Sequence, residues 1–316
     1  MHVGDIGAGA IIKRKGKGAR YRDHCFYLFL EVTHQRISVL RQGCRGIMSL
    51  PPHPEKDKAI IVGRKIEKLQ HVATEIEEDG GKVDYFSCDI REEDSVKAMI
   101  KQIIAKHGHI SGLVNNAGGQ FPSPLASINQ KGWETVVRTN LTGGFLVARE
   151  VYTQSMSKNG GSIVNIVADM WGGMPGMGHS GAARAGMVNF TQTAAIEWGV
   201  SGVRVNSIAP GWVASSGMDS YPLHMKPYIL SLKDAVPLKR LGTESEISSV
   251  ICFLLSEGAN FISGDCIRID GAASQGSRVW PLPNAKNSES YNGFHRATTP
   301  KIFQDEENAK DTKNNS

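Results

Sequence analysis

Residues 113–118 read Leu-Val-Asn-Asn-Ala-Gly and directly follow an apolar run that is typical of a β-strand. Small residues and paired amides at the carboxyl end of a parallel strand let the backbone approach a nucleotide, while the amide side chains can tie neighbouring strands together. A plain turn uses Asn and Gly as well. The string alone therefore leaves both interpretations open.

Two further strings strengthen the nucleotide interpretation. Residues 206–213, Asn-Ser-Ile-Ala-Pro-Gly-Trp-Val, end a later predicted strand. There Pro210 fixes the backbone, and Gly211 leaves space for a flat ring. Residues 139–143, Thr-Asn-Leu-Thr-Gly, fall inside a predicted helix.

The elements that must position these strings alternate regularly from Lys58 onward. Short apolar runs separated by helical periodicity predict an α/β fold with a doubly wound parallel sheet of the Rossmann-like kind, in which helices cover both faces. The predicted strands are 59–63, 83–88, 110–114, 162–167, 203–208 and 266–269, and the predicted helices are 65–79, 92–107, 131–158, 179–200 and 243–256. The apolar run Cys25–Val32 is a candidate for a further strand of this sheet.

The order and spacing of the three strings resemble the short-chain dehydrogenase/reductase family, from about Ala59 to Gly271. Within it, residues 115–121, 179–186, 252–256 and 261–264 look like the peroxisomal trans-2-enoyl-CoA reductases. The resemblance implies an NADPH-dependent reduction of an enoyl-CoA thioester, self-association into a homo-oligomer through 131–158 and 179–200, and a peroxisomal location. The final Asn-Asn-Ser does not match the Ser-Lys-Leu type of peroxisomal address, which leaves the cytoplasm as the other expectation.

The resemblance also assigns residues to the cofactor. A guanidinium at Arg64, with Lys65 beside it, would meet the 2′-phosphate of NADPH, although a solvated helix start is the simpler alternative. The other residues implied are Asp89 and Ile90 beside the adenine, Asn116 and Gly118 at the adenosine ribose, and Pro210 and Gly211 at the nicotinamide.

The phosphate-binding turn of the family has no counterpart here. Relatives open with a strand, Thr-Gly-x-x-x-Gly-x-Gly and a helix whose amino terminus receives the pyrophosphate. No such string precedes Arg64, and Gly4-Asp5-Ile6-Gly7-Ala8-Gly9 has different spacing. The first βα unit is therefore expected to be atypical or missing. Residues 1–57 form an atypical basic and Gly-rich segment, 58–274 the family-like domain, and 275–316 an expected disordered tail.

The usual acid is also replaced. Relatives carry Tyr-x-x-x-Lys, and the matching positions here hold Ser180 and Arg184. Of the four catalytic positions of the family, only that of Asn140 holds the residue type found in relatives. Conjugate reduction tolerates this change, because Ser180 and His179 could act as neutral donors to a thioester oxygen while Arg184 takes the ribose contacts of the missing Lys.

Three alternatives remain open at this point. His179 and Ser180 could merely cap the helix that begins there. The chain could be a catalytically silent relative that acts as a binding or interface protein. It could also reduce another carbonyl substrate, although the missing Tyr and Lys argue against ketone chemistry.

The composition limits the remaining function classes. The formal charge is +5, but residues 1–50 hold nine Lys or Arg against three Asp or Glu, which leaves about −1 for residues 51–316. The predicted domain is therefore almost neutral, and no nucleic-acid partner is expected. The five cysteines include no Cys-x-x-C pair, so no metal site is expected. Cys25–Val32 is much shorter than a membrane span, and no span is expected.

Overall fold

A parallel seven-stranded sheet forms the centre of the computed structural model. The structure describes residues 26–30, 58–215, 218–219, 221, 223–276, 283–285, 287–293, 296 and 298–304. The strand order is β3-β2-β1-β4-β5-β6-β7, and each neighbouring pair is parallel. This order is that of a doubly wound sheet, which confirms the predicted fold class.

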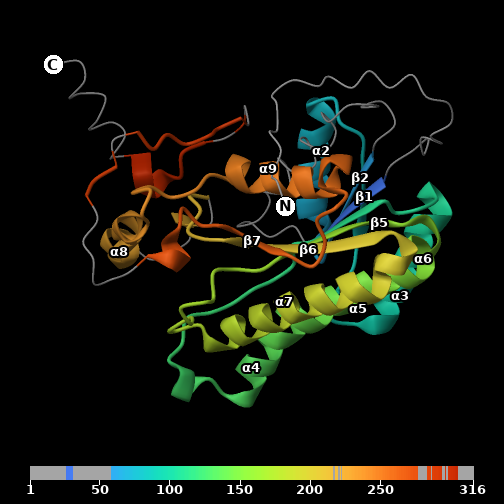
Figure 1. The fold of residues 1–316 in the computed structure, drawn as a ribbon, viewed down its shortest axis with the longest axis horizontal. Coiled ribbons are helices and arrows are strands. Elements are labelled where there is room, and N and C mark those ends of the chain that lie inside the picture. Colours follow the sequence, from blue (N-terminus) through green and yellow to red (C-terminus); the bar gives the residue numbers. More distant parts are fainter. Residues whose placement is uncertain are drawn as a thin grey trace, which may run out of the picture.

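The strands and helices follow the sequence prediction closely. The strands are β1 (Phe26–Leu30), β2 (Lys58–Gly63), β3 (Val83–Ser87), β4 (Gly112–Asn115), β5 (Gly161–Ile166), β6 (Val203–Pro210) and β7 (Cys266–Ile269). The main helices are α2 (Ile66–Glu78), α3 (Glu93–His107), α4 (Gln130–Val137), α5 (Gly143–Val151), α6 (Ser157–Asn159), α7 (Gly178–Trp198), α8 (Lys226–Ser231) and α9 (Glu244–Leu255). Helices α2 and α9 cover one face of the sheet, and α3, α5 and α7 cover the other (Figure 1).

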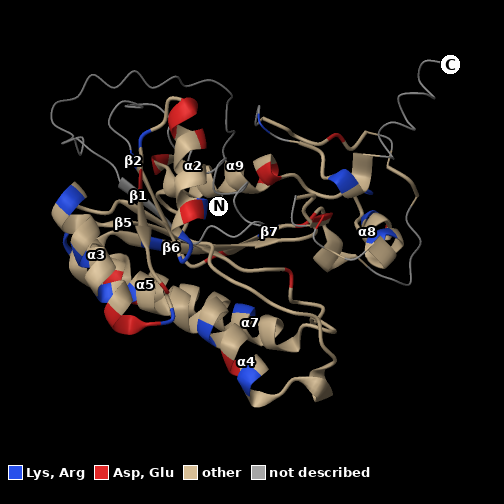
Figure 2. Cartoon of the chain, turned by 180° about the vertical axis from the view of Figure 1, so that it is seen from behind, with Lys and Arg blue, Asp and Glu red and all other residues tan. Residues whose placement is uncertain are grey.

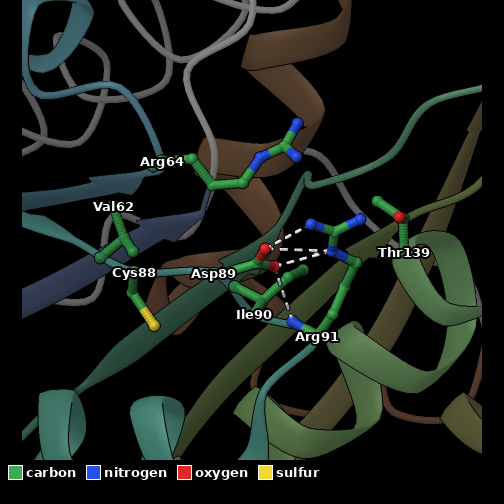
Figure 3. A pocket seen from close by; sticks show the side chains of 8 residues that line it. Val62, Arg64, Cys88, Asp89, Ile90, Arg91 and Thr139 are labelled. Carbon is green, nitrogen blue, oxygen red and sulfur yellow. Dashed lines mark hydrogen bonds and ion pairs between the residues drawn. The ribbon is translucent and has the colours of Figure 1, made fainter.

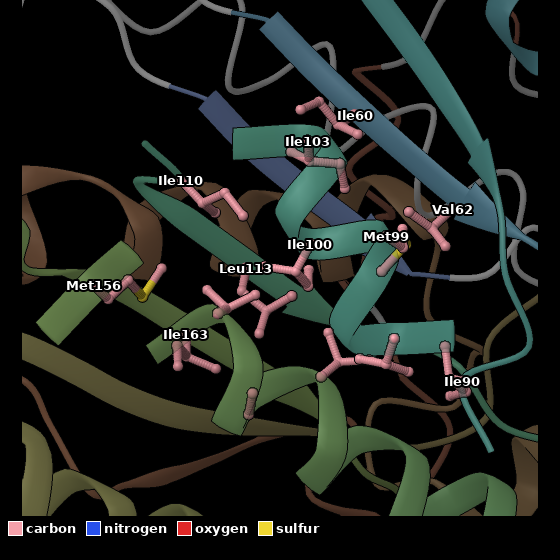
Figure 4. Packing of buried hydrophobic residues seen from close by; sticks show 14 of the residues in the cluster. Ile60, Val62, Ile90, Met99, Ile100, Ile103, Ile110, Leu113, Met156 and Ile163 are labelled. Atoms are coloured by element: carbon pink, nitrogen blue, oxygen red, sulfur yellow. The ribbon is translucent and has the colours of Figure 1, made fainter. Parts of the chain in front are cut away.

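Alternation along the strands divides the core between the two faces. In β2, Ile61 packs into the cluster with α2 and α9, whereas Ile60 and Val62 pack into the cluster with α3 and α5. Successive side chains of a strand point to opposite faces, so a strand covered on both sides must be apolar throughout. Figure 4 shows the second cluster, where Ile100 and Ile103 of α3 lie against the sheet.

The strand of the first βα unit is present. β1 pairs in parallel with β2 on one side and β4 on the other, with Leu28 opposite Ile60 and Leu113. The apolar run near residue 25 is therefore a strand of the sheet, and it lies inside the sheet, between β2 and β4. The segment 31–57, where this fold places its pyrophosphate-binding turn and the following helix, lies outside the described residues.

The segment predicted as one helix over 131–158 is helical, but its α-helical hydrogen-bond pattern is interrupted twice. Two π-helical turns, Arg138–Thr142 and Tyr152–Met156, separate α4, α5 and α6. Such turns are rare and are frequently found at functional sites. The first of them carries Asn140, whose side chain is buried.

Part of the carboxyl-terminal segment packs on the sheet's helices. Arg296 pairs with Glu78 and Asp79 at the end of α2, at 3.0 Å each. Ile302 and Phe303 pack against the apolar cluster around α8. The expectation of a disordered tail stays a prediction for 275–316 as a whole, but its described residues make specific contacts.

Acidic and basic side chains are interspersed over the helices in Figure 2. Among the described residues no helix is long and apolar enough to cross a membrane. The same part of the chain holds no group of three or more His, Cys, Asp or Glu side chains that could bind a metal ion.

Candidate functional site

The candidate site lies at the carboxyl edge of the sheet. All seven strands are parallel, so the residues that follow them meet at one edge. The strand order reverses between β1 and β4, and a ligand crevice is expected at such a point. Arg64, Asp89, Asn116, Asp169 and Gly211 follow five different strands and thus share this edge.

A pocket lies where β2 and β3 end. Three of the residues predicted to hold the adenosine, Arg64, Asp89 and Ile90, line it together (Figure 3). Lys65 is exposed and is not among the lining residues. The full lining comprises Val62, Gly63, Arg64, Cys88, Asp89, Ile90, Arg91 and Thr139.

An ion pair organises the polar wall of this pocket. The Arg91 guanidinium binds the Asp89 carboxylate, with Nε 2.8 Å from Oδ1 and 3.1 Å from Oδ2. The hydrogen bond from Arg91 lowers the pKa of Asp89 against the opposing effect of burial, and the charge of Arg64 lowers it further. Burial raises the pKa of the Cys88 thiol to about 11, so that side chain is a neutral part of the wall.

The paired amides after β4 have different positions. Asn115 donates from Nδ2 to Asn165 Oδ1 at 2.8 Å, and Asn165 donates to Thr191 Oγ1 at 2.8 Å. This chain ties β4, β5 and α7 together, as the sequence predicts for such amides. Asn116 and Gly118 are buried beyond the end of β4. Their roles toward a ribose stay predictions.

A hydrogen-bonded relay brings Asn140 and Ser180 together. The backbone N–H of Gly119 donates to Asn140 Oδ1 at 2.8 Å. Asn140 Nδ2 donates to Ser180 Oγ at 3.4 Å, and Ser180 Oγ donates to Gln120 Oε1 at 2.7 Å. Asn140 and Ser180 are fully buried, whereas Gln120 is exposed. The relay therefore runs from the interior to the surface.

The direction of this relay is fixed at its buried end. A backbone N–H can only donate, so the Asn140 oxygen must face Gly119 and its NH₂ must face Ser180. The Ser180 oxygen then accepts, and its proton is left for an acceptor on the Gln120 side. Ser180 is thus held as a hydrogen-bond donor.

His179 and Arg184 are buried next to the relay on α7. His179 Nδ1 accepts the backbone N–H of Ser180 at 2.9 Å, and its ring meets Phe121 edge to face at 4.6 Å. Because Nδ1 accepts, the ring proton lies on Nε2, which has no partner among the described residues. Arg184 is 2% exposed, and its Nη1 donates to the Ile166 carbonyl at the end of β5, at 2.6 Å.

The capping alternative holds for only one of the two residues. α7 begins after Met177, which makes no side-chain cap. His179 takes up a backbone N–H of the first turn, as a capping side chain does. The Ser180 hydroxyl is bound to Gln120 and Asn140 instead.

The loop between β5 and α7 carries Asp169 and Trp171. Asp169 follows β5, and its Oδ1 is buried with no hydrogen-bond partner in the described part of the chain. Burial and the nearby charge of Asp270 raise the pKa of Asp169, against a hydrogen bond from the Trp171 backbone and the charge of Arg268. The Arg268 guanidinium lies 4.0 Å from the centre of the Trp171 ring.

Pro210 and Gly211 lie at the end of β6, beside β7. A Cβ on Gly211 would come within 2.8 Å of the Asp270 backbone, which explains why the position holds glycine. The neighbour that requires the glycine is thus Asp270 rather than a bound ring. The predicted contact of Pro210 and Gly211 with a nicotinamide stays a prediction.

Three residues of the candidate site were not assigned a role by the sequence analysis. Arg91 and Thr139 line the nucleotide pocket, and Gln120 ends the relay. The Asp-x-Arg spacing at 89–91 was the available signal for Arg91. Thr139 reaches the pocket from the same π-helical turn that supplies Asn140 to the relay, and periodicity does not reveal such a turn.

The sheet order and the pocket beyond β2 and β3 are typical of a dinucleotide-binding α/β fold. Residues 55–274 match the family model described as enoyl-(acyl carrier protein) reductase. The chain belongs to the short-chain dehydrogenase/reductase family of oxidoreductases.

The matches to individual relatives cover most of the length of each relative. A probable 2,4-dienoyl-CoA reductase of Bacillus subtilis is 36% identical over 67% of this chain and 85% of its own length. A 3-oxoacyl-[acyl-carrier-protein] reductase of Staphylococcus epidermidis is 32% identical over 65% and 83%. The solved structure of a citronellol catabolism dehydrogenase from Pseudomonas aeruginosa PAO1 is 54% identical, covers 81% of this chain and 99% of that one, and has a TM-score of 0.67.

Proposed function

We propose that the chain is an NADPH-dependent reductase of trans-2-enoyl-CoA thioesters. The observation that carries this proposal is the relay through Asn140 and Ser180, since it holds the neutral Ser180 hydroxyl as a fixed donor. The family match to an enoyl reductase model and the dienoyl-CoA reductase relative support the same substrate class.

The residues of the nucleotide pocket fit NADPH. Arg64 supplies a cation at the end of β2, where this fold holds the adenosine ribose, and can bind a 2′-phosphate through paired N–H groups. Arg91 neutralises Asp89, whose free carboxylate would repel that phosphate. When bound, the cofactor supplies a hydride to the β carbon of the enoyl thioester and leaves as NADP⁺.

The chain's own residues then stabilise the charge that develops. As the new C–H bond forms, the electrons of the C=C bond move toward the thioester oxygen. Ser180 is positioned to donate its hydrogen bond to that oxygen, and Asn140 holds the hydroxyl in its orientation. Water protonates the α carbon, so this step needs no residue of low pKa.

The test is turnover of the purified full chain. We expect NADPH oxidation with a trans-2-enoyl-CoA, measured by absorbance, and a loss of about 10²- to 10³-fold in kcat for Ser180→Ala. Ser249→Ala, an exposed serine on α9, is the matched control. An unchanged rate in Ser180→Ala would remove the proposed role of that residue.

A second candidate function has one specific observation in its favour. The 54% identical relative is named a citronellol catabolism dehydrogenase, which suggests an alcohol or aldehyde substrate for this chain. Reduction of an aldehyde requires transfer of a proton to the alkoxide that forms. A serine hydroxyl is a weak acid, and α7 supplies no lysine that would lower its pKa, so Ser180 would transfer this proton poorly. Parallel assays with citronellol and NAD(P)⁺ decide between the two substrates. Fluorescence titration with NADPH tests the silent alternative, which predicts no saturable binding.

We also propose that the chain self-associates through the outward faces of α5 and α7. Phe145 is 37% exposed and Ile196 is 79% exposed on these faces. Large apolar side chains grouped on adjacent helices favour a partner surface. Light scattering should report an oligomer for the full chain and a smaller particle for Ile196→Glu.

A further inference from the structure

We infer that Gln120 is a stand-in for the substrate carbonyl, which must displace it to reach Ser180. The inference rests on the proposed function, because the ligand is the acyl thioester of that reaction. It adds a residue that selects for a hydrogen-bond acceptor at this position of the ligand.

The first observation is that Gln120 satisfies a buried donor. Ser180 is 0% exposed, and among the described residues its proton has one acceptor, Gln120 Oε1 at 2.7 Å. A buried donor left without an acceptor destabilises the folded protein. The free protein therefore gains from holding Gln120 in place.

The second observation is that only Gln120 can leave this relay easily. Asn140 is held by the Gly119 backbone and is buried, as is Ser180. Gln120 is exposed, and a Cβ at the preceding Gly119 would have nothing within 4 Å. Its amide can move into water and keep its hydrogen bonds there.

The third step is chemical likeness. A glutamine carbonyl and a thioester carbonyl are both neutral sp² oxygen acceptors, so each can accept the Ser180 proton. The Ser180 hydroxyl has one proton, so only one of the two oxygens can accept it at a time. Binding of an acyl thioester therefore replaces one hydrogen bond by another, whereas a ligand without a carbonyl gains nothing by displacing Gln120.

The experiment compares two probes that differ only in the carbonyl. Hexanoyl-CoA carries the thioester oxygen, and S-hexyl-CoA, a thioether, lacks it. Neither can be reduced at a C=C bond, so calorimetry with NADP⁺ present measures binding alone. The variant is Gln120→Met, which keeps the side-chain length and removes the amide, and Gln130→Met, an exposed glutamine at the start of α4, is its matched control.

We expect Gln120→Met to tighten hexanoyl-CoA binding by about 3- to 10-fold, the worth of one net hydrogen bond. The affinity for S-hexyl-CoA should not change. The gain in affinity for hexanoyl-CoA should disappear in Gln120→Met/Ser180→Ala, because the Ser180 hydroxyl proton is no longer present. In turnover, KM for the enoyl-CoA should fall in Gln120→Met and stay at the wild-type value in Gln130→Met. Circular dichroism and NADPH affinity check that the variants are folded.

The outcomes separate this inference from the proposed function. Unchanged or weaker binding of hexanoyl-CoA to Gln120→Met, with the wild type binding it normally, overturns the role of Gln120 alone. Weaker binding would assign Gln120 a direct contact with the bound ligand. If the wild type binds neither probe and reduces no enoyl-CoA, the proposed function fails and the inference fails with it.

Discussion

At the scale of single residues, the candidate site depends on groups whose donor or acceptor role is fixed by a neighbour. Ser180 is a donor because Asn140 donates to it, and Asn140 faces that way because a backbone N–H claims its oxygen. A serine in place of tyrosine therefore still presents a proton in a set direction. What it lacks is acidity, and this limits it to stabilising charge rather than transferring a proton.

Arg64 provides a residue-scale prediction about the cofactor. Arg64→Ala should weaken NADPH binding by about 10-fold or more, because a charge-assisted hydrogen bond contributes about 1.5–3 kcal/mol. NADH lacks the 2′-phosphate, and its affinity should stay the same. Fluorescence titration of both cofactors measures the difference. Lys65→Ala is the comparison, and an equal loss there would move the phosphate contact away from Arg64.

Asp169 provides a prediction about pH. Burial and Asp270 raise the pKa of Asp169 in the folded protein, so between its unfolded and folded pKa values the folded state binds more protons. The free energy of unfolding therefore falls as the pH rises through that window. Asp169→Asn removes this loss, so it should match the wild type below about pH 4 and exceed it at pH 7. Urea unfolding across this range tests it, and a difference that does not vary with pH would contradict it.

At the scale of elements, helix α9 is tied to the rest of the chain at its first turn. Thr243 Oγ1 accepts the Glu246 backbone N–H, and the Glu246 carboxylate accepts the Thr243 N–H, which forms a capping box. Arg240 binds the same carboxylate through two nitrogens, at 2.7 and 2.9 Å. Thr243 also donates to the Tyr291 carbonyl at 2.6 Å. One side chain therefore caps a helix and holds a distant segment.

Removing this cap gives an element-scale prediction. Thr243→Ala should lower the free energy of unfolding by about 1 kcal/mol, the usual contribution of an N-cap, and somewhat more if the bond to Tyr291 adds to it. Denaturant titration measures the change. Thr243→Ser keeps both hydrogen bonds and should be close to the wild type. Equal losses in the two variants would mean that the methyl group, not the hydroxyl, carries the effect.

The elements themselves could be predicted because their pattern is strong and local. A strand covered on both faces is largely apolar, and the middle residues of β2, β4 and β5 fit this pattern. The buried polar exceptions are Asn115, Ser162 and Asn165. The π-helical turn at Arg138–Thr142 could not be predicted, since one extra residue in a turn leaves the apolar spacing nearly unchanged. The contact between Gln120 and Ser180 joins residues 60 apart, and local patterns carry no information about such pairs.

At the scale of the whole molecule, residues beyond the family match bind the helices that cover one face of the sheet. The match ends at residue 274, yet Tyr291 binds the start of α9 and Arg296 binds the end of α2. These contacts lead the chain across one face of the molecule toward α8. The stretch that includes α8, residues 223–235, follows β6 at the carboxyl edge of the sheet, and we propose that it is the substrate lid of this site.

The last contacts of this segment predict how the lid responds to mutation. Ile302 donates its N–H to Asp219 at 3.0 Å and packs with Phe303 against Met218, Ile229 and Leu232. Ile302→Asp places a charge in this apolar cluster and should raise amide hydrogen exchange across residues 223–235 by about 10-fold, with little change in the sheet, because local opening can occur without global unfolding. Mass spectrometry of exchanged peptides measures both regions, and Lys301→Ala, the exposed neighbour, is the control. A uniform rise over the whole sheet would mean that the segment stabilises the entire fold and has no particular hold on the lid.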